Sequence, residues 1–167
     1  MLSNHVQVLK LFSLCEKTIE HKKLQKIIYI AKSFGAPFAE KYRYHRLGPY
    51  SEDLFVRLEE LCNLQFLKEE RDDRDIVYML TEQGETFLHK LLVREELDEF
   101  TDVYKDLNSQ PLSILEQMAA LLYFQKQMES EGVRDPQLNS RYSNQEWLHA
   151  ETHLMMLRER QVSYEGS

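Results

Sequence analysis

The chain has 167 residues, of which 43% are hydrophobic and 29% charged, and its formal net charge is −7. This length and composition predict one globular domain, or one domain with an appended dimerisation element, and argue against long disordered segments. The acidic total argues against a general nucleic-acid binder, which needs a basic surface.

The cysteines and the apolar runs narrow the class of protein further. Cys15 and Cys62 lie on apolar stripes of separate predicted helices and form no CxxC pair, so we expect buried free thiols. No apolar run reaches the roughly 18 to 20 residues that span a bilayer, and the N-terminus lacks the layout of a signal peptide. We therefore expect a cytosolic protein that does not contact membranes.

Amphipathic helices are predicted over residues 4–17 and 22–34. Spacings of three to four residues place the apolar side chains of each segment on one face. Ser3 is expected to cap the first helix, and Gly35, followed by Pro37, is expected to end the second. The lysines of the second helix fall mostly outside its apolar face. Residues 41–47, KYRYHRL, then alternate between cationic and aromatic side chains, which predicts a short strand.

The corner Gly48-Pro49-Tyr50-Ser51 is predicted to start the third helix. Gly48 allows the chain to turn, Pro49 fixes the next backbone angle, and Ser51 accepts a hydrogen bond from the first helical turn. Tyr50 and Phe55 occupy the two positions of a hydrophobic staple. We interpret these four residues as a structural corner rather than as a functional motif.

The remaining elements are a hairpin and further helices. The third helix is predicted over 51–64, and two strands over 66–80 are joined by a charged, solvent-facing tip at 69–75. Thr81 is expected to cap a helix over 81–97, Pro111 to precede one over 113–128, and the capping box Ser143–Glu146 to start the last one.

This order predicts a mainly α fold with a small β-hairpin, that is, an α+β fold. Three helices followed by a two-stranded wing are typical of a winged helix-turn-helix domain, here over residues 1–97, and residues 98–167 then form a C-terminal helical extension. Its methionine and aromatic side chains favour core or dimer packing over a ligand pocket. They are Met118, Tyr123, Phe124, Met128, Trp147, Met155 and Met156.

Three stretches carry a resemblance to a known family: KKLQKIIYIAKSFGAPF, YRYHRLGPYSEDLFVRLEELCNLQFL and IVYMLTEQGETFL. They resemble the YwgA-like bacterial proteins, which are related to the Panacea (SocA-like) group. The resemblance implies a winged-helix domain with an antitoxin, regulatory or adaptor role. Gln65 departs from many winged-helix relatives, which have glycine there. Glutamine adopts the left-handed conformation at a cost of about 1 kcal/mol, so the turn either differs or is strained.

Charge changes sign along the chain. Residues 21–50 carry a net charge of +6 and residues 51–75 a net charge of −5. Carboxylates on helix 51–64 would repel phosphate, so we do not favour that helix as a reader of duplex DNA. The better candidate for an anionic partner is the basic segment between Lys22 and Arg46. Its candidate residues are Lys22, Lys23, Lys26, Lys41, Tyr42, Arg43, Tyr44 and Arg46. Alternatively, these cations pair with the acids of the same molecule or only solvate it.

Catalytic and metal motifs are weak or missing. Glu146, His149 and His153 have helical spacing and are weak candidates for a metal site, but a metal needs further ligands, so we expect no metal. GxSxG, HExxH, Walker and GxGxxG patterns do not occur, and we expect no enzyme activity and no cofactor.

The sequence therefore predicts a non-enzymatic interaction module that binds a protein partner of unknown identity. A homodimer through the C-terminal helices is expected as well. The alternative is a transcriptional regulator that binds nucleic acid through the basic segment.

Overall fold

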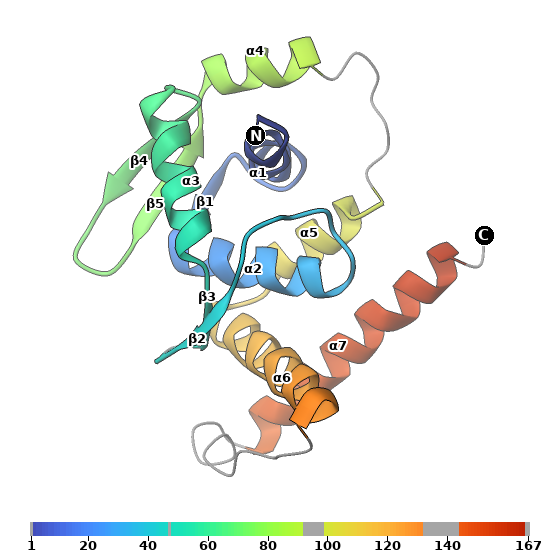
Figure 1. Ribbon diagram of the computed structural model, residues 1–167. Coiled ribbons are helices and arrows are strands. Elements are labelled where there is room, and N and C mark those ends of the chain that lie inside the picture. The colour runs from blue at the N-terminus through green and yellow to red at the C-terminus, as the bar shows by residue number, and fades with distance from the viewer. Residues whose placement is uncertain (1, 47, 92–98, 132–143, 166–167) are drawn as a thin grey trace.

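The computed structural model describes residues 2–46, 48–91, 99–131 and 144–165, which form seven helices and five short strands (Figure 1). The helices are α1 (Leu2–Leu14), α2 (His21–Ser33), α3 (Glu52–Asn63), α4 (Glu82–Leu91), α5 (Thr101–Ser109), α6 (Leu112–Glu131) and α7 (Asn144–Glu165). The strands are β1 (Thr18–Glu20), β2 (Arg43–His45), β3 (Gly48–Tyr50), β4 (Leu67–Arg71) and β5 (Ile76–Leu80).

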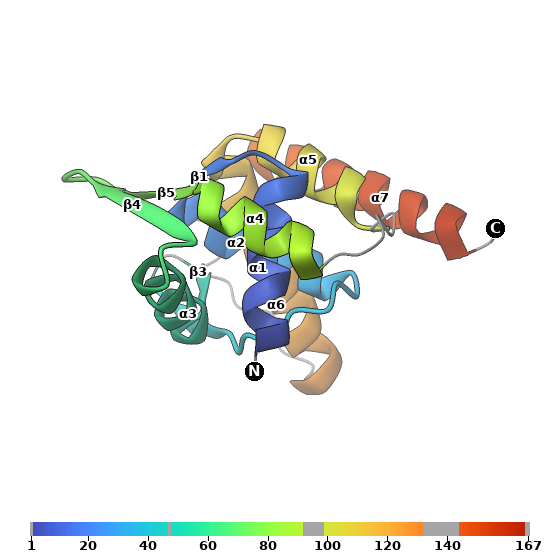
Figure 2. The ribbon, with the colours of Figure 1, turned by 90° about the horizontal axis from the view of Figure 1, so that it is seen from above.

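The strands form two small antiparallel sheets. One has the order β1-β5-β4, and the other pairs β2 with β3. The predicted α+β class is therefore confirmed, with the expected order of three helices followed by the β4–β5 hairpin. In Figure 2 this hairpin projects from one side of the molecule, while α7 extends on the opposite side.

The first helix and the strand after it differ from the prediction. α1 already includes Ser3, so Ser3 does not cap it, and it ends at Leu14 instead of Lys17. The chain straightens there because the Lys17 carbonyl accepts a hydrogen bond of 2.7 Å from the Leu80 backbone N–H, at the start of the pairing between β1 and β5. A three-residue strand leaves little periodic signal, and its pairing partner lies some sixty residues away.

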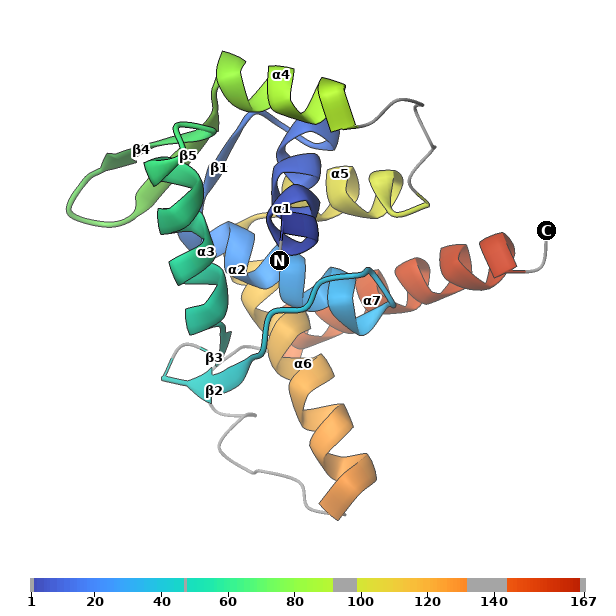
Figure 3. The same cartoon turned by 45° about the horizontal axis from the view of Figure 1, so that its top comes forward.

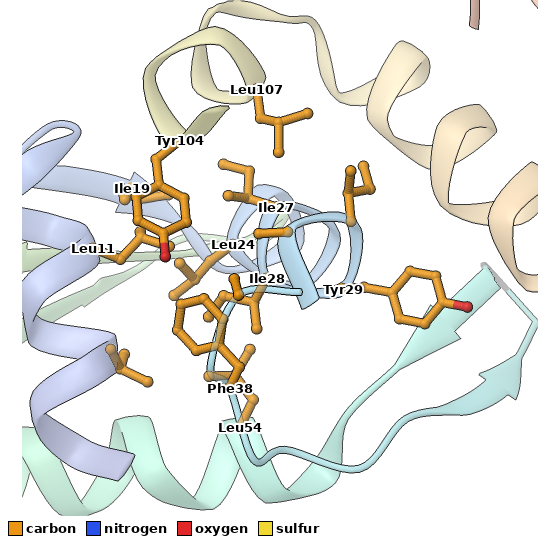
Figure 4. Packing of buried hydrophobic residues seen from close by; sticks show 14 of the residues in the cluster. Leu11, Ile19, Leu24, Ile27, Ile28, Tyr29, Phe38, Leu54, Tyr104 and Leu107 are labelled. Carbon is orange, nitrogen blue, oxygen red and sulfur yellow. The ribbon is translucent and has the colours of Figure 1, made fainter. Parts of the chain in front are cut away.

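Helix α2 is the centre of the core. Its positions from Leu24 to Ala31 are all buried, and Figure 4 shows Leu24, Ile27 and Ile28 among side chains from α1, α3 and α5. The predicted helix end is confirmed. Gly35 has a φ of 100°, and the backbone N–H of Ala36 donates to the Ala31 carbonyl at 3.0 Å, as in a Schellman motif.

The C-terminal helices share this core. Figure 3 shows α6 crossing beneath α2 with α7 beside it, and α5 is an additional helix that we did not predict. Tyr104, Leu107, Leu115 and Met118 are fully or almost fully buried in the same hydrophobic cluster as α2. The predicted boundary at residue 97 lies outside the described residues.

Other sequence predictions in the C-terminal part also lie outside the described residues. They concern Ser143 and the side chains of Met128, Glu146 and Trp147. The described part of α6 is confirmed, since it follows Pro111 directly.

Thr81 caps α4 as predicted, because its Oγ1 accepts a hydrogen bond of 3.0 Å from the Gly84 backbone N–H. Gly84 lies against the Phe66 carbonyl, and a Cβ atom at this position would clash with that carbonyl and with Leu80. Glycine is therefore required here by close packing of α4 against the start of β4.

The turn after α3 is the left-handed one that glycine usually occupies. Gln65 has a φ of 64°, and it is the one non-glycine residue with positive φ in the described chain. The Phe66 N–H donates to the Leu61 carbonyl and the Gln65 N–H to the Cys62 carbonyl, both at 3.0 Å. The bonds are those of a Schellman motif, so the turn has kept its geometry and Gln65 carries the strain.

We predict that Gln65→Gly raises the free energy of unfolding by roughly 0.5–1 kcal/mol, because glycine removes the left-handed strain but adds some unfolded-state entropy. Urea denaturation measures this change. Gln65→Ala is the matched control, since alanine also truncates the side chain but keeps the Cβ strain. An unchanged or lower stability of Gln65→Gly would contradict the assignment of strain to this turn.

Candidate functional site

The corner before α3 is fixed by a buried glutamine of α2. The Gln25 Nε2 donates to the Ser51 carbonyl at 2.9 Å, and its Oε1 accepts from the Ser51 N–H, also at 2.9 Å. Ser51 is fully buried, and its Oγ accepts from the Leu54 N–H at 3.1 Å, which confirms the predicted helix cap. Gly48 has a φ of 101°, as expected of a residue that turns the chain. These contacts hold the corner against α2 and start α3.

A buried histidine lies among the aromatic rings next to this corner. His21 forms a hydrogen bond of 3.1 Å with the Tyr50 hydroxyl, and its ring lies 5.5 Å from that of Phe55 and 5.8 Å from that of Tyr78. The two residues of the predicted staple thus both pack on His21. Burial lowers the pKa of His21, against a smaller opposing effect of Asp75.

The structure divides the basic segment into bound and exposed cations. Lys26 is only 5% exposed, and its Nζ donates to the Pro49 carbonyl at 2.7 Å. The Lys23 Nζ donates to the Asn108 carbonyl at 2.6 Å, which ties α2 to the end of α5. The Tyr42 hydroxyl donates to the Gln25 carbonyl at 2.9 Å. These side chains hold the fold together and do not form a continuous surface for an anion.

Burial lowers the pKa of Lys26 to about 8, and the carboxylate of Glu116 opposes this shift. Because the folded-state pKa lies below the unfolded value, the free energy of unfolding rises with pH between the two values. At neutral pH the protonated amine therefore costs stability, which the hydrogen bond to Pro49 partly offsets.

The exposed part of the basic segment is the β2–β3 hairpin. We define the hairpin surface as Lys41, Arg43, Tyr44, His45 and Arg46, all of which are exposed. Tyr44 is 38% exposed, and its ring contacts those of Tyr123 and Phe124 on α6 at 4.9 and 5.2 Å. The predicted segment therefore contributes one cationic surface with an aromatic neighbour. Lys22 is also exposed, at the start of α2.

The outward side of α3 is acidic with an apolar residue at its middle. We define the α3 face as its exposed side chains, which are Glu52, Asp53, Val56, Glu59, Glu60 and Asn63. Val56 is 50% exposed. Arg57 lies off this face, because its guanidinium pairs with the fully buried Glu40. The α3 face thus carries four carboxylates and no cation.

Of the three residues proposed for a metal site, the structure describes the side chains of His149 and His153. The His153 Nε2 lies 2.7 Å from the Asp106 Oδ2 of α5, and His149 is exposed. Among the side chains that the structure describes, no group of three His, Cys, Asp or Glu residues has the arrangement of a metal site. The helical spacing of His149 and His153 is better explained by packing of α7 against α5 at His153.

Both cysteines are free and half-buried. Burial raises the pKa of each thiol to about 11, so both are protonated near neutral pH and poorly nucleophilic.

Across the part of the chain described by the structure, none of the helices combines the length and apolar character needed to cross a bilayer.

Two residues of this region escaped the sequence analysis. Gln25 lies within the helix predicted over 22–34 and His21 just before it, and local patterning marks neither as a contact residue, although both form contacts at the corner. The one available signal was their position: His21, Gln25 and Ile28 have the spacing of one helix face, so the two polar side chains lie on the same buried side of α2 as Ile28. Partners 26 and 29 residues away cannot be read from such local periodicity.

We predict that Lys26→Glu lowers the free energy of unfolding by about 3–5 kcal/mol, because a carboxylate would be buried facing the Pro49 carbonyl and near Glu116. Thermal and urea denaturation measure the loss. Arg43→Glu is the matched charge reversal on the hairpin surface, and we expect it to change stability by less than about 0.5 kcal/mol. Equal effects of the two substitutions would contradict the division of the basic segment.

We predict that acid destabilises the protein partly through His21. The pKa of His21 is near 6.5 in the unfolded state and lower in the folded state. The contribution of His21 to the free energy of unfolding is therefore complete above these two pKa values. It is lost as pH falls through them, by up to about 1.4 kcal/mol per pH unit. Urea denaturation between about pH 7 and about pH 5 measures the slope. His21→Phe should flatten it, whereas the exposed control His149→Gln should not. An unchanged slope in His21→Phe would show that His21 is not the group responsible.

Comparison with known proteins places the chain in a family. No family model matches it. Over 155 aligned residues the chain is 39% identical to the uncharacterized protein YwgA of Bacillus subtilis (strain 168), and the match covers 88% of this chain and 92% of YwgA. Identity at this level over nearly the full length of both chains confirms the resemblance noted in the sequence: the chain belongs to the YwgA family.

Proposed function

We propose that this chain is a non-enzymatic, winged-helix interaction module that binds a protein partner through the α3 face. The observation that carries the proposal is the exposure of Val56 within a ring of carboxylates at the position where a winged-helix protein would contact DNA. The partner surface that fits it is basic with an apolar centre. Binding, and not chemistry, is the proposed activity.

Electrostatics favours a protein over DNA at this face. Phosphate contacts supply a large share of protein–DNA affinity, and each needs a cation or an N–H donor. In the first turn of α3, the Leu54 N–H is already bonded to the Ser51 Oγ. Glu52, Asp53, Glu59 and Glu60 would all face the phosphates and repel them. A basic protein surface would be attracted by the same carboxylates.

A regulatory or adaptor role, and the relation to the Panacea (SocA-like) group, belong to the same proposal. Both follow from the sequence resemblance and fit a module that acts by binding.

We further propose that the chain forms a homodimer through its C-terminal helices. The support is an apolar stripe on α7 formed by the exposed residues Leu148, Met155 and Met156, opposite the buried residues Ala150, Leu154 and Leu157.

A second candidate function has one observation in its favour. The hairpin surface keeps exposed cations beside Tyr44, whose ring packs on Tyr123 and Phe124. Cations next to aromatic rings suit the binding of single-stranded nucleic acid, in which phosphates are neutralised and bases stack. This candidate uses a different surface from the α3 face, so the two can be separated by mutation.

We expect Val56→Asp and Glu59→Lys to abolish capture of specific partners from a lysate of the source cells by the immobilised chain, with capture measured by quantitative mass spectrometry. Glu151→Lys, an equally exposed charge reversal on α7, is the matched control and should leave capture unchanged. Each captured protein is then purified and titrated against the same variants. Partners that bind all variants alike would overturn the assignment of the α3 face.

The nucleic-acid alternative is tested with mixed DNA and RNA oligonucleotides at low and high salt. Binding that weakens steeply with salt and is lost on changing Lys41, Arg43 and Arg46 to Glu would support it. No binding at low salt would remove it.

Sedimentation of the wild type and of Met155→Asp tests the homodimer, because an aspartate in the centre of the α7 stripe should dissociate it.

A further inference from the structure

Strand β4 is the open edge of the three-stranded sheet. In the described chain it pairs only with β5. The Thr81 N–H donates to the Phe66 carbonyl at 3.1 Å, and the Leu80 N–H donates in the other direction, to Lys17 beside β1. Leu67 lies opposite Leu80 in the pairing of β4 with β5. Backbone groups alternate in direction along a strand, so those of Lys68 and Glu70 point toward β5, as the Phe66 carbonyl does.

The backbone groups of the other β4 residues therefore point away from the sheet. Leu67 is only 2% exposed, so we call the outward N–H and C=O groups of Glu69 and Arg71 the β4 edge. An edge of this kind forms main-chain hydrogen bonds with an added strand. The β4–β5 hairpin projects from the molecule, as Figure 2 shows, so the distal part of the edge is not covered by another described element.

A groove with a volume of about 980 Å³ adjoins the β4 edge. It is formed by the end of α3, the start of β4 and one side of α4, and its lining includes Cys62, Leu67, Glu69, Thr86 and Lys90. Phe66 and Phe87 also line it, and their rings stack with centroids 4.4 Å apart. Because Glu69 belongs to both features, a strand added at the edge would lie beside the groove.

The charges around the edge indicate what such a strand carries. Side chains of an added strand alternate between two sides. On the side of Glu69, two carboxylates, Glu69 and Glu59, and one cation, Arg71, act on the Cys62 thiol, and Arg71 is paired with Glu69 at 3.3 Å. This side therefore has an excess of negative charge. On the other side, Phe66 and Phe87 offer an apolar surface, and the lysines Lys68 and Lys90 also line the groove.

We propose that the β4 edge and its groove bind an extended segment of a partner protein as an added strand, with apolar side chains against Phe66 and Phe87 and lysine or arginine side chains near Glu59 and Glu69. Main-chain hydrogen bonds supply affinity, and the alternation of apolar and basic residues supplies specificity. This site goes beyond the function proposed above, because it does not use Val56.

The probe is a fluorescein-labelled, acetylated peptide of the sequence Lys-Val-Lys-Phe-Lys-Val-Lys, titrated against the full chain by fluorescence anisotropy. An added strand uses the N–H groups of alternate residues only. Two N-methylated versions of the peptide are compared. The first is methylated on the backbone nitrogens of the lysines, and the second on those of the valines and the phenylalanine. We expect either one of them to lose at least about tenfold in affinity and the other to bind. Equal binding of the two versions would overturn strand addition.

Variants of the protein itself, titrated with the unmodified peptide, test the same contact. Glu69→Pro removes an outward N–H without removing a bond to β5, and proline is tolerated at such edge positions. Glu69→Ala is its matched control, because it loses the same carboxylate. We expect at least about tenfold weaker peptide binding for Glu69→Pro than for Glu69→Ala. Equal affinities would overturn the proposal.

A second measurement keeps the test valid if Glu69→Pro does not fold. In the wild-type protein, saturating peptide should protect the amides of Glu69 and Arg71 from hydrogen exchange, whereas those of Lys68 and Glu70 are already bonded and should change little. The acidic peptide Glu-Val-Glu-Phe-Glu-Val-Glu should bind at least about tenfold more weakly. Unprotected Glu69 and Arg71 amides, or equal binding of the acidic peptide, would contradict the proposed contact.

Two further comparisons distinguish binding at this site from binding at the α3 face and from self-association. Val56→Asp should leave peptide affinity unchanged, so failure of the proposed function and failure of this inference are distinguishable. Loss of peptide binding in Val56→Asp would overturn the independence of the two sites. A dimer that Glu69→Pro dissociates and Glu69→Ala does not would show that a second copy of the chain, and not a partner segment, occupies the edge.

Discussion

The hydrogen bonds between Gln25 and Ser51 determine where α3 begins. A side-chain amide recognises both backbone groups of one residue, and all of these atoms are buried. An unpaired buried polar group costs about 1–3 kcal/mol, so displacement of the corner would leave several such penalties at once. The start of α3 is therefore fixed to α2. Tyr42, which donates to the Gln25 carbonyl, attaches the approach to β2 at the same point.

Fixing the corner also distributes the charges. β3 is held against α2, and Lys26 is enclosed with its amine on the Pro49 carbonyl. The arginines of the hairpin surface remain outside, and α3 leaves the corner with its carboxylates outward. The basic run of the sequence thus includes one buried cation, one cation bonded to α5 and an exposed cationic hairpin. The two surfaces of opposite charge are consequences of one buried contact.

Much of the fold was accessible from the sequence because it depends on local patterns. The ends of α2 and α3, the cap at Ser51 and the β4–β5 hairpin follow from glycines, capping residues and apolar spacing. β1 and the roles of Lys23 and Lys26 depend on partners distant in the chain, which local spacing does not report. α5 was missed although Val103, Tyr104 and Leu107 have helical spacing, because the acidic residues around them favoured a connection. Of the candidate site, the sequence correctly located the opposed charges but not which cations are exposed.

The carboxylates of α3 do not all have the same physical reason to be there. Glu52 and Asp53 stabilise the positive end of the helix, so folding alone accounts for them. Glu60 pairs with His5 of α1 at 2.8 Å, which also has a structural use. Glu59 lies in the C-terminal half of the helix, where the macrodipole does not favour a carboxylate, and the β-branched Val56 gains nothing from its exposure. These two residues are the part of the α3 face that folding does not explain, and a binding function rests most strongly on them.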